Sequence, residues 1–296
     1  MWSGAGPADL KKAFRPRSLY SSKRENGRVV IIGGSERFHG APILSGLAGY
    51  STLAALRVGI GYAITCVPKY DLKVVMGISP NLIVRPLGGD SLQPKDFKML
   101  KDECSKAAAV AIGGGINRRS KQSLKTAALI VRYCIRAGKR VVVDADALYA
   151  IGQMGKLGKN VIITPNQREF SLFFKDRLNE RNLKQRVDAA LMVSRKLGCI
   201  VVLKGHATVV TDGSRVKVVK SRTSTLATMG TGDILSGMVA GFAALNDDAF
   251  IVATAGAYTL SLVGDLMYKE KGNHGIASDL VGLIPKVLKQ FDKNVK

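Results

Sequence analysis

A glycine-rich segment directly before an apolar stretch with helical periodicity is the strongest candidate for chemistry in this sequence. The segment is Thr228-Met-Gly-Thr-Gly-Asp-Ile-Leu-Ser-Gly237. Free backbone N–H groups and the positive end of the helix dipole at Gly230 and Gly232 suit a phosphate or a developing anion. Asp233, at the helix start, is a candidate general base, so the segment predicts phosphoryl transfer to a hydroxyl. The alternative is that Asp233 is an ordinary N-cap and the glycines only permit a tight turn.

Further polar or glycine-rich loops are each expected to follow directly on a strand. They are Gly33-Gly34-Ser35, Gly113-Gly114-Gly115 and Thr164-Pro165-Asn166. Ligands of open α/β proteins bind at the carboxyl edge of the sheet, so these loops outline a cleft there. Lys204-Gly-His-Ala-Thr208 lies between two expected strands and could contact a nucleotide, although such a glycine more often marks a simple turn.

Two common nucleotide fingerprints and the usual metal motifs are missing from the sequence. No stretch supplies the P-loop pattern, and Arg118 stands where a dinucleotide fingerprint beginning at Gly113 needs its third glycine. His39, His206 and His274 are too scattered to be assumed metal ligands, so we assign no structural metal.

The elements that must position these loops alternate between short apolar strands and longer amphipathic helices. Strands without polar alternation are those buried on both faces, so we predict an α/β fold with a mostly parallel sheet and helices on both faces. Asp212-Gly213-Ser214 favours a hairpin turn between Thr208–Thr211 and Val216–Val219, which predicts an antiparallel edge. The expected strands are Val29–Ile32, Tyr62–Val67, Val110–Ile112, Arg140–Asp144, Val161–Thr164 and Ile200–Leu203. The expected helices are Pro42–Gly59, Lys95–Lys106, Lys121–Ala137, Asp233–Leu245, Ala249–Tyr268 and Ser278–Phe291.

Composition favours one folded domain preceded by a basic arm. With 46% hydrophobic residues and no Pro-rich or low-complexity linker, residues 28–296 are expected to form a single domain. Residues 1–27 are expected to be an exposed basic arm, and a transit peptide is the weaker alternative because Asp9 and Glu25 interrupt it. The longest uncharged stretch, Ala249–Gly264, is shorter than the roughly 20 residues that span a bilayer, so we expect no membrane segment.

The net charge of +23 indicates that the protein attracts anions. A nucleic-acid-binding protein is one interpretation, but aromatic residues are only 6% and do not interleave with the charges, so we expect no specific nucleic-acid partner. Dinucleotide and nucleotide ligands fit the charge better. Four widely separated cysteines, with no Cys-x-x-Cys pair, favour free thiols and a cytoplasmic location.

In order along the chain, these motifs resemble the nucleotide-dependent NAD(P)H-hydrate dehydratase family of the ribokinase-like superfamily. The resemblance runs from about Ser21 to the last expected helix. It is carried by Val30-Ile-Ile-Gly-Gly-Ser35, Gly40-Ala41-Pro42, Ala54-Ala-Leu-Arg-Val-Gly59, Ile112-Gly-Gly-Gly115, Asp144-Ala-Asp-Ala-Leu148, Thr164-Pro-Asn166 with Glu169-Phe170, Leu203-Lys-Gly205 with Thr208, Gly230-Thr-Gly-Asp-Ile-Leu-Ser-Gly237 and Ala277-Ser-Asp-Leu280.

The resemblance implies a ribokinase-like three-layer fold and repair of damaged nicotinamide cofactor. The hydrate of NADH or NADPH would be phosphorylated on its hydroxyl by ADP or ATP with Mg²⁺, and phosphate would then be eliminated. Asp233 would accept the hydroxyl proton. The hydrate would contact Ala41, Gly115, Asn166 and Asp233. The nucleotide would contact Lys204, Gly205, His206, Ala207, Thr208, Gly230, Thr231 and Gly232.

The resemblance also implies partners. The family suggests a homo-tetramer, and prokaryotic relatives often carry an N-terminal epimerase domain. Only about 28 residues precede the first expected strand, so we expect epimerisation to come either from a separate epimerase or from slow spontaneous exchange of the epimers.

Departures from the family pattern leave two questions open. Asn166-Gln-Arg-Glu169 replaces the His-Pro-Gly-Glu of many bacterial members and is more similar to the ATP-using eukaryotic form, so the donor is either ADP or ATP. The alternative function is a ribokinase-like kinase of a small vitamin precursor, since Gly-Thr-Gly-Asp at a helix start serves both activities. A relative that has lost activity is a further alternative, against which the intact Asp233 argues.

Overall fold

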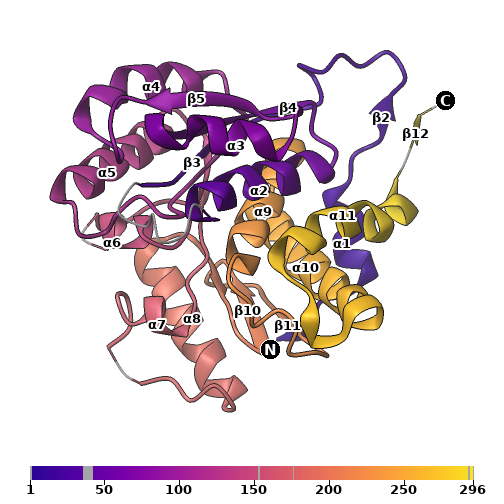
Figure 1. Ribbon diagram of the computed structural model, residues 1–296. Coiled ribbons are helices and arrows are strands. Elements are labelled where there is room, and N and C mark those ends of the chain that lie inside the picture. Colours follow the sequence, from indigo (N-terminus) through magenta and orange to yellow (C-terminus); the bar gives the residue numbers. More distant parts are fainter. Residues whose placement is uncertain (1, 36–42, 153, 176, 293, 296) are drawn as a thin grey trace.

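The computed structural model describes residues 2–35, 43–152, 154–175, 177–292 and 294–295. A ten-stranded sheet in the order β1-β11-β10-β9-β8-β7-β6-β3-β4-β5 forms its centre (Figure 1). The strands of this sheet are β1 (Ser3–Gly4), β3 (Arg28–Ile32), β4 (Tyr62–Pro68), β5 (Ile83–Leu87), β6 (Ala109–Ile112), β7 (Arg140–Val143), β8 (Val161–Ile163), β9 (Ile200–Leu203), β10 (Ala207–Thr211) and β11 (Val216–Lys220). A separate pair joins β2 (Arg17–Ser18) in parallel to β12 (Asn294–Val295).

Helices cover both faces of the sheet, as the apolar strands predict. One face packs against α1 (Pro7–Ala13), α2 (Ile43–Arg57), α3 (Leu72–Ile78), α9 (Thr231–Leu245), α10 (Ala249–Lys271) and α11 (Ala277–Leu288). The other packs against α4 (Phe97–Ser105), α5 (Lys121–Arg136), α6 (Ala147–Ile151), α7 (Gln167–Phe170) and α8 (Leu183–Leu197). Strand β3 shows why the strands read as continuous apolar runs: Val29 and Ile31 enter one core, whereas Val30 and Ile32 enter the other. The predicted α/β fold is confirmed.

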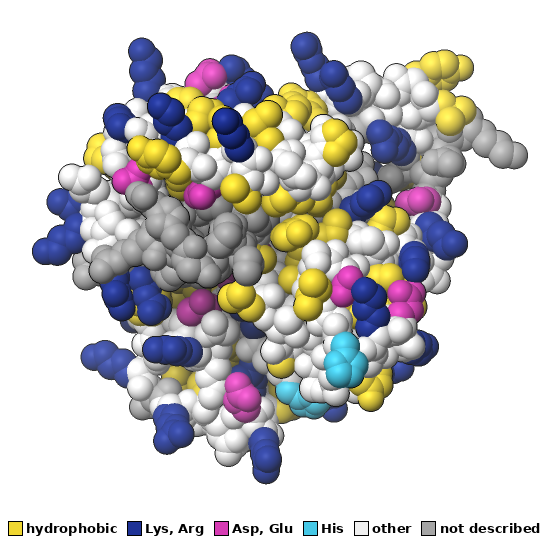
Figure 2. All heavy atoms as spheres, viewed as in Figure 1, with side chains coloured by type: hydrophobic (Ala, Val, Ile, Leu, Met, Phe, Trp, Pro, Cys, Tyr) yellow, Lys and Arg dark blue, Asp and Glu magenta, His cyan; other side chains and the backbone are white. Residues whose placement is uncertain are grey.

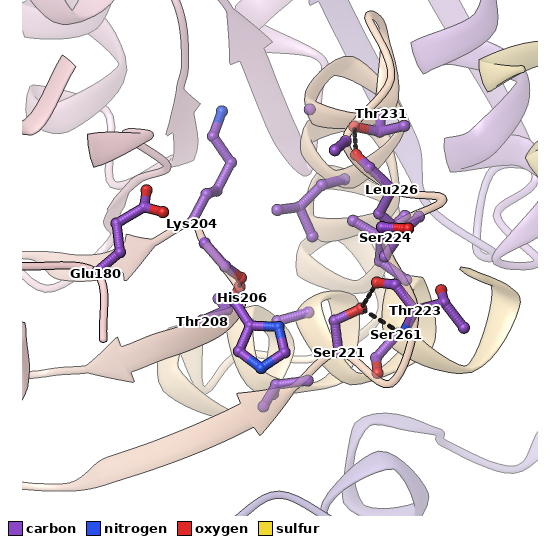
Figure 3. A pocket seen from close by; sticks show the side chains of 17 residues that line it. Glu180, Lys204, His206, Thr208, Ser221, Thr223, Ser224, Leu226, Thr231 and Ser261 are labelled. Atoms are coloured by element: carbon purple, nitrogen blue, oxygen red, sulfur yellow. Dashed lines mark hydrogen bonds between the residues drawn. The ribbon is translucent and has the colours of Figure 1, made fainter. Parts of the chain in front are cut away.

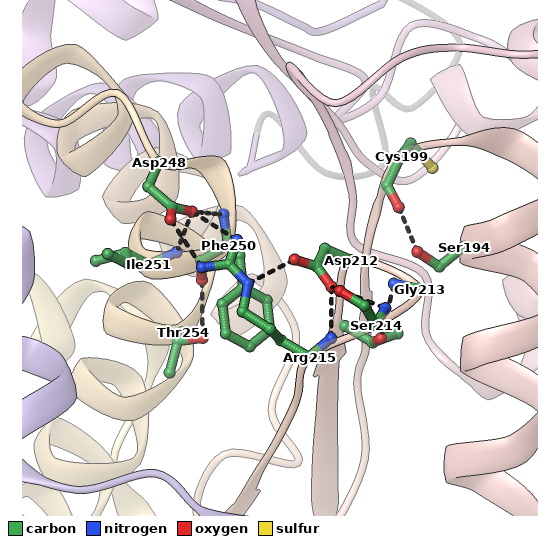
Figure 4. A network of polar contacts seen from close by, with 11 residues as sticks. Ser194, Cys199, Asp212, Gly213, Ser214, Arg215, Asp248, Phe250, Ile251 and Thr254 are labelled. Atoms are coloured by element: carbon green, nitrogen blue, oxygen red, sulfur yellow. Dashed lines mark hydrogen bonds and ion pairs between the residues drawn. The ribbon is translucent and has the colours of Figure 1, made fainter. Parts of the chain in front are cut away.

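The antiparallel hairpin lies at one edge of the sheet, as the sequence predicts, and only the two-residue strand β1 adds beyond it. Strand β10 pairs antiparallel with both β9 and β11, and β1 then adds to β11 in parallel. The Asp212 carboxylate accepts the backbone N–H groups of Ser214 and Arg215 and closes the turn. Arg215 also pairs with Asp248 at the start of α10 and lies over the Phe250 ring (Figure 4). The turn is therefore fixed to the neighbouring helix layer.

The first 27 residues are more deeply integrated than the exposed arm that the sequence predicts. Leu10 and Ala13 of α1 are fully buried in the core that α10 shares, because α1 presents its apolar side to α10. Further along, Leu19 and Tyr20 are exposed, with 71% and 96% of their surface accessible. The exposed basic arm is thus restricted to part of this segment.

Helix α10 is long and apolar enough to cross a membrane by length and composition alone. Two thirds of its most apolar window is buried inside the protein, which is the pattern of a core helix. The apolar character of α10 is accounted for by packing against α1, α9 and α11.

Candidate active site

Helix α9 begins at the glycine-rich segment, as expected. Gly230, its N-cap, has a φ of +92°, and a Cβ at this position would lie 2.6 Å from Leu47 Cδ2, so the turn needs glycine. The N–H group of Gly232 has no acceptor among the residues that the structure describes. An unpaired donor in the first turn of a 15-residue helix is suited to an anion.

Asp233 lies in the first turn of α9, in a narrow cleft between the helix and the glycine loops. Gly113, Gly114, Asp144 and Ser236 also line this cleft. Burial, and to a lesser degree the nearby Asp144 carboxylate, raise the pKa of Asp233 to about 7, although the Lys204 ammonium acts in the opposite direction. A carboxyl group with this pKa can accept a proton near neutral pH and release it again.

Backbone contacts join the glycine loops at the carboxyl edge of the sheet. Gly34 donates a hydrogen bond to the carbonyl of Gly114 at 2.7 Å. A Cβ on Gly114 would lie 2.4 Å from Asp233 Oδ1, and one on Gly113 would lie 1.8 Å from the Asp144 carbonyl oxygen. Only glycine allows so close an approach, so these residues bring the loops against the Asp233 carboxyl group.

Asp144 and Glu169, to which the sequence analysis assigns no role, form a charged cluster with Lys204 beside the same cleft. Lys204 Nζ is 2.8 Å from Asp144 Oδ1 and 3.9 Å from Glu169 Oε2. Burial lowers the pKa of Lys204, but the two carboxylates more than offset this, and the net direction is upward. Burial raises the pKa of Glu169. The sequence does contain a signal for the two carboxylates as site residues. Asp144 follows β7 and Glu169 follows β8, at the carboxyl edge of the parallel strands where ligands bind.

The predicted hydrate contacts are placed less completely than the nucleotide contacts. Gly115 is buried with a φ of +70°, in the loop after β6. Asn166 is exposed, and its side chain caps α7 by accepting the Glu169 N–H at 2.9 Å, while Glu169 accepts the Asn166 N–H in return. Ala41 lies outside the described residues.

A cavity of about 420 Å³ adjoins the start of α9 at Thr231 and Gly232 (Figure 3). Six predicted nucleotide contacts line it: Lys204, Gly205, His206, Thr208, Thr231 and Gly232. Two do not: Ala207 is buried with its side chain in the core, and Gly230 acts through the backbone turn. The rest of the cavity lining contains residues that were not predicted as nucleotide contacts from the sequence. They include Val219, Ser221, Thr223, Leu226, Leu260 and Ser261.

The cavity is lined by both apolar and hydroxyl-bearing side chains. Apolar side chains such as Leu226 and Leu260 suit the face of a base, whereas hydroxyl groups such as Ser221 suit its polar edge or the ribose. Lys204 and Gly232 lie where the cavity meets the Asp233 cleft. Within the described ranges, no group of three or more His, Cys, Asp or Glu side chains could hold a metal by itself.

Comparison with known families assigns the chain to one of them. The sequence model of the NAD(P)H-hydrate dehydratase family matches residues 29–286. The chain belongs to this family. The family resemblance identified from the sequence motifs is thereby confirmed.

Individual relatives agree with the family assignment. The ADP-dependent (S)-NAD(P)H-hydrate dehydratase of Nitrosopumilus maritimus is 34% identical over 286 residues, covering 96% of each chain. The bifunctional NAD(P)H-hydrate repair enzyme of Hyperthermus butylicus is 33% identical over 288 residues. The chain spans about half of such bifunctional relatives, 52% of the Hyperthermus enzyme.

Solved structures confirm the ribokinase-like fold. A ribokinase-like superfamily protein from Enterococcus faecalis aligns with a TM-score of 0.83 and 21% identity, covering 99% of this chain and 97% of that one. The ADP/ATP-dependent NAD(P)H-hydrate dehydratase of Bacillus subtilis, crystallised with ATP and Mg²⁺, aligns with a TM-score of 0.77 and 23% identity over 96% of each chain.

Proposed function

We propose that this protein is a nucleotide-dependent (S)-NAD(P)H-hydrate dehydratase that restores NADH or NADPH from the hydrated cofactor. The observation that carries the proposal is the placement of Asp233 where the glycine-loop cleft meets the nucleotide-sized cavity at Gly232 and Lys204. A substrate hydroxyl that reaches Asp233 and a phosphoryl donor in the cavity would therefore meet at the start of α9.

The chemistry proceeds in two steps. In the first step, the oxygen of the hydrate hydroxyl bonds to the terminal phosphorus of the nucleotide while Asp233 accepts the hydroxyl proton. The shortened nucleotide leaves with the electrons of the broken phosphorus–oxygen bond. The new phosphate group then departs with the electrons of the carbon–oxygen bond. Loss of a proton from the adjacent ring carbon forms the carbon–carbon double bond, which completes net loss of water coupled to nucleotide hydrolysis.

The start of α9 stabilises the charge that develops on the transferring phosphoryl group. The free Gly232 N–H and the helix dipole are fixed in place before the reaction, so no reorganisation is needed when charge builds up. Lys204, held by Asp144 and Glu169, provides a positive charge at the junction of the two spaces.

A magnesium ion fits the carboxylates next to the cavity. Mg²⁺ is usually held by one or two carboxylates together with substrate phosphates, and Asp144 and Glu169 provide carboxylate oxygens at this edge. When bound with the nucleotide, the ion would neutralise phosphate charge. The full-length relatives named ADP-dependent favour ADP as the donor, and ATP is the alternative.

We propose a separate NAD(P)H-hydrate epimerase as a partner; relatives named bifunctional repair enzymes, which carry a second activity beside the dehydratase, support a functional link between the two. A homo-oligomer and a cytoplasmic location are also proposed, the latter supported by the four buried, free cysteines of the described chain.

The direct test measures recovery of reduced-nicotinamide absorbance from a mixture of NADH hydrate epimers. Purified protein and Mg²⁺ are incubated with ADP, with ATP or with neither nucleotide. Recovery that requires one nucleotide supports the proposal and identifies the donor. No recovery with either nucleotide, despite nucleotide binding, would contradict it and favour a kinase of another hydroxyl compound.

A further inference from the structure

Arg186 of α8 is the largest fully buried side chain of the described residues, with 1% of its surface exposed. It lies directly behind the Lys204–Ala207 loop, called the nucleotide loop below, which borders the cavity. Its Nη2 atom is within hydrogen-bond distance of three carbonyl oxygens at the end of β9 and the start of β10. These are the carbonyls of Leu203 at 3.3 Å, Lys204 at 3.0 Å and Ala207 at 3.4 Å. One guanidinium group therefore fixes both ends of the loop that borders the cavity.

These contacts set the direction of the loop's amide groups. In a planar trans peptide the C=O and the following N–H point in opposite directions. The Lys204 carbonyl points at Arg186, so the Gly205 N–H points away from it, and Gly205 lines the cavity. This N–H has no acceptor among the described residues, which leaves it available to a nucleotide phosphate.

Close packing makes the arrangement specific to glycine. A Cβ on Gly205 would lie 2.6 Å from Arg186 Nη2 and 3.1 Å from its Cζ. The loop backbone thus rests directly against the guanidinium plane. Lys204 is consequently held at both ends, its carbonyl by Arg186 and its ammonium group by Asp144.

Arg186 also reaches the loop on the hydrate side. Its Nη1 donates to Gln167 Oε1 at 3.0 Å, and Gln167 is the first residue of α7. Asn166 caps that helix, and its third residue, Glu169, approaches Lys204 Nζ. The same side chain therefore connects the loops on both sides of the reaction centre.

A purely structural role would not call for a charge at this position. Among the described residues no carboxylate lies within 4 Å of the guanidinium group, so the Glu180 charge acts on Arg186 only from a greater distance, and the Nε of Arg186 has no hydrogen-bond partner. A buried charge is costly when it has no carboxylate partner, and apolar side chains fill such a space at lower cost. The hydrogen bonds that compensate this charge run to the carbonyls of Leu203, Lys204 and Ala207 and to Gln167.

We propose that Arg186 is a positioning residue that holds the Lys204–Ala207 loop in its nucleotide-binding conformation. This inference rests on the proposed function, in which the cavity binds the phosphoryl donor. Arg186 does not touch substrate; it acts through the carbonyl groups that it holds.

The test compares Arg186→Met and Arg186→Lys with a matched control, Arg195→Met. Arg195 lies on the same helix and also holds a loop carbonyl, that of Gly213 at 2.7 Å in the β10–β11 turn. For each variant the Tm, the nucleotide Kd by calorimetry, and the KM values for nucleotide and hydrate are measured. Nucleotide binding is titrated without hydrate, so it can be read in the absence of turnover.

For Arg186→Met we expect the nucleotide Kd and KM to rise at least about tenfold, while the hydrate KM changes less than about threefold. Arg186→Lys should be impaired almost as much, because one ammonium group cannot bridge the carbonyls and Gln167. Arg195→Met should leave both KM values unchanged.

A folded Arg186→Met protein with a nucleotide Kd within twofold of the wild type would overturn the proposal. So would equal losses for both substrates that follow the fall in Tm. If neither Arg186 variant folds at the assay temperature, the residue is structural and the proposal fails. Wild-type protein that neither binds nucleotide nor converts the hydrate would instead refute the proposed function.

Discussion

At Asp233, neighbouring groups act in opposite directions on the pKa of a single carboxyl group. Burial and the Asp144 carboxylate raise its pKa to about 7, and Lys204 lowers it. The reaction needs the ionised form, because only a carboxylate can accept the hydroxyl proton. The residue therefore titrates in the pH range where small changes in its surroundings alter the active fraction.

The pH dependence of turnover should report this titration. We expect kcat/KM to rise as pH increases through about 7 and then to level off, since the carboxyl group is protonated and inactive below its pKa. Replacing Asp144 with Asn should move this limb to lower pH, because one of the groups that raise the pKa is removed. Rate profiles from pH 5 to 9 test both statements, and an unmoved limb in the variant would argue against the assigned cause.

Asp233→Asn should remove the base while keeping the cavity. We expect turnover to fall by about 10²-fold or more with nucleotide Kd changed less than about threefold. Asp279→Asn is a suitable control, because Asp279 also lies in the first turn of a long helix, where it caps α11 and pairs with Lys271. A near-normal rate for Asp233→Asn, measured by absorbance recovery, would exclude Asp233 as the base.

At the scale of elements, the close approach of α2 and α9 holds the start of α9 in place. A Cβ on Gly237 would lie 2.0 Å from the Ser51 carbonyl oxygen, and one on Gly241 would lie 2.9 Å from the Ala55 carbonyl oxygen. Backbone atoms of a packed helix cannot move aside as a flexible side chain can. The small residues of this interface therefore determine where the Asp233 helix lies.

Gly237→Ala should destabilise the protein strongly, by about 3 kcal/mol or more of unfolding free energy, because the added methyl group forces the helices apart. Gly282→Ala is the matched control: it lies in the interior of α11 with nothing within 4 Å of an added Cβ. This substitution should stabilise by about 0.5–1 kcal/mol through helix propensity. Denaturant unfolding measures both, and equal stability of the two variants would contradict the packing argument.

The sequence predicts those elements whose local pattern and tertiary environment agree. The central strands and α5, α9, α10 and α11 follow their apolar patterns closely. Strand β5 is not predicted, because it lies at the sheet edge, contains Pro86 and buries little of its surface. Helix α8 is also left out, although Asn182 and Gly198 mark its two ends.

The candidate site is predictable where a motif sits on one chain segment and less so where the fold assembles it. Asp233, Gly232 and the Lys204 loop follow from local sequence. Their contacts with Asp144 and Glu169, and the buried position of Arg186, depend on how separate strands and helices pack, which no local pattern contains.

For the whole molecule, the dominant property is the charge of +23. Figure 2 shows Lys and Arg side chains distributed around the visible face, with fewer acidic side chains between them. Such a field raises the local concentration of anionic ligands and speeds their association. Both proposed substrates carry phosphates, so the charge should act on both.

Salt should therefore weaken capture of the substrates more than the chemical step. We expect kcat/KM for nucleotide and for hydrate to fall at least about threefold when KCl is raised tenfold from low ionic strength, with kcat changed little. Steady-state kinetics at several KCl concentrations test this. A salt-independent kcat/KM would show that the charge does not contribute to capture.

The measurement that tests the central claim most directly is the stoichiometry of products in one reaction with NADH hydrate, Mg²⁺ and the active nucleotide. Inorganic phosphate and recovered reduced nicotinamide are quantified over the same time course. Phosphoryl transfer followed by elimination at Asp233 predicts equimolar amounts of the two, and loss of both in Asp233→Asn. A stable phosphorylated product without recovered absorbance, or recovery without phosphate release, would contradict the account.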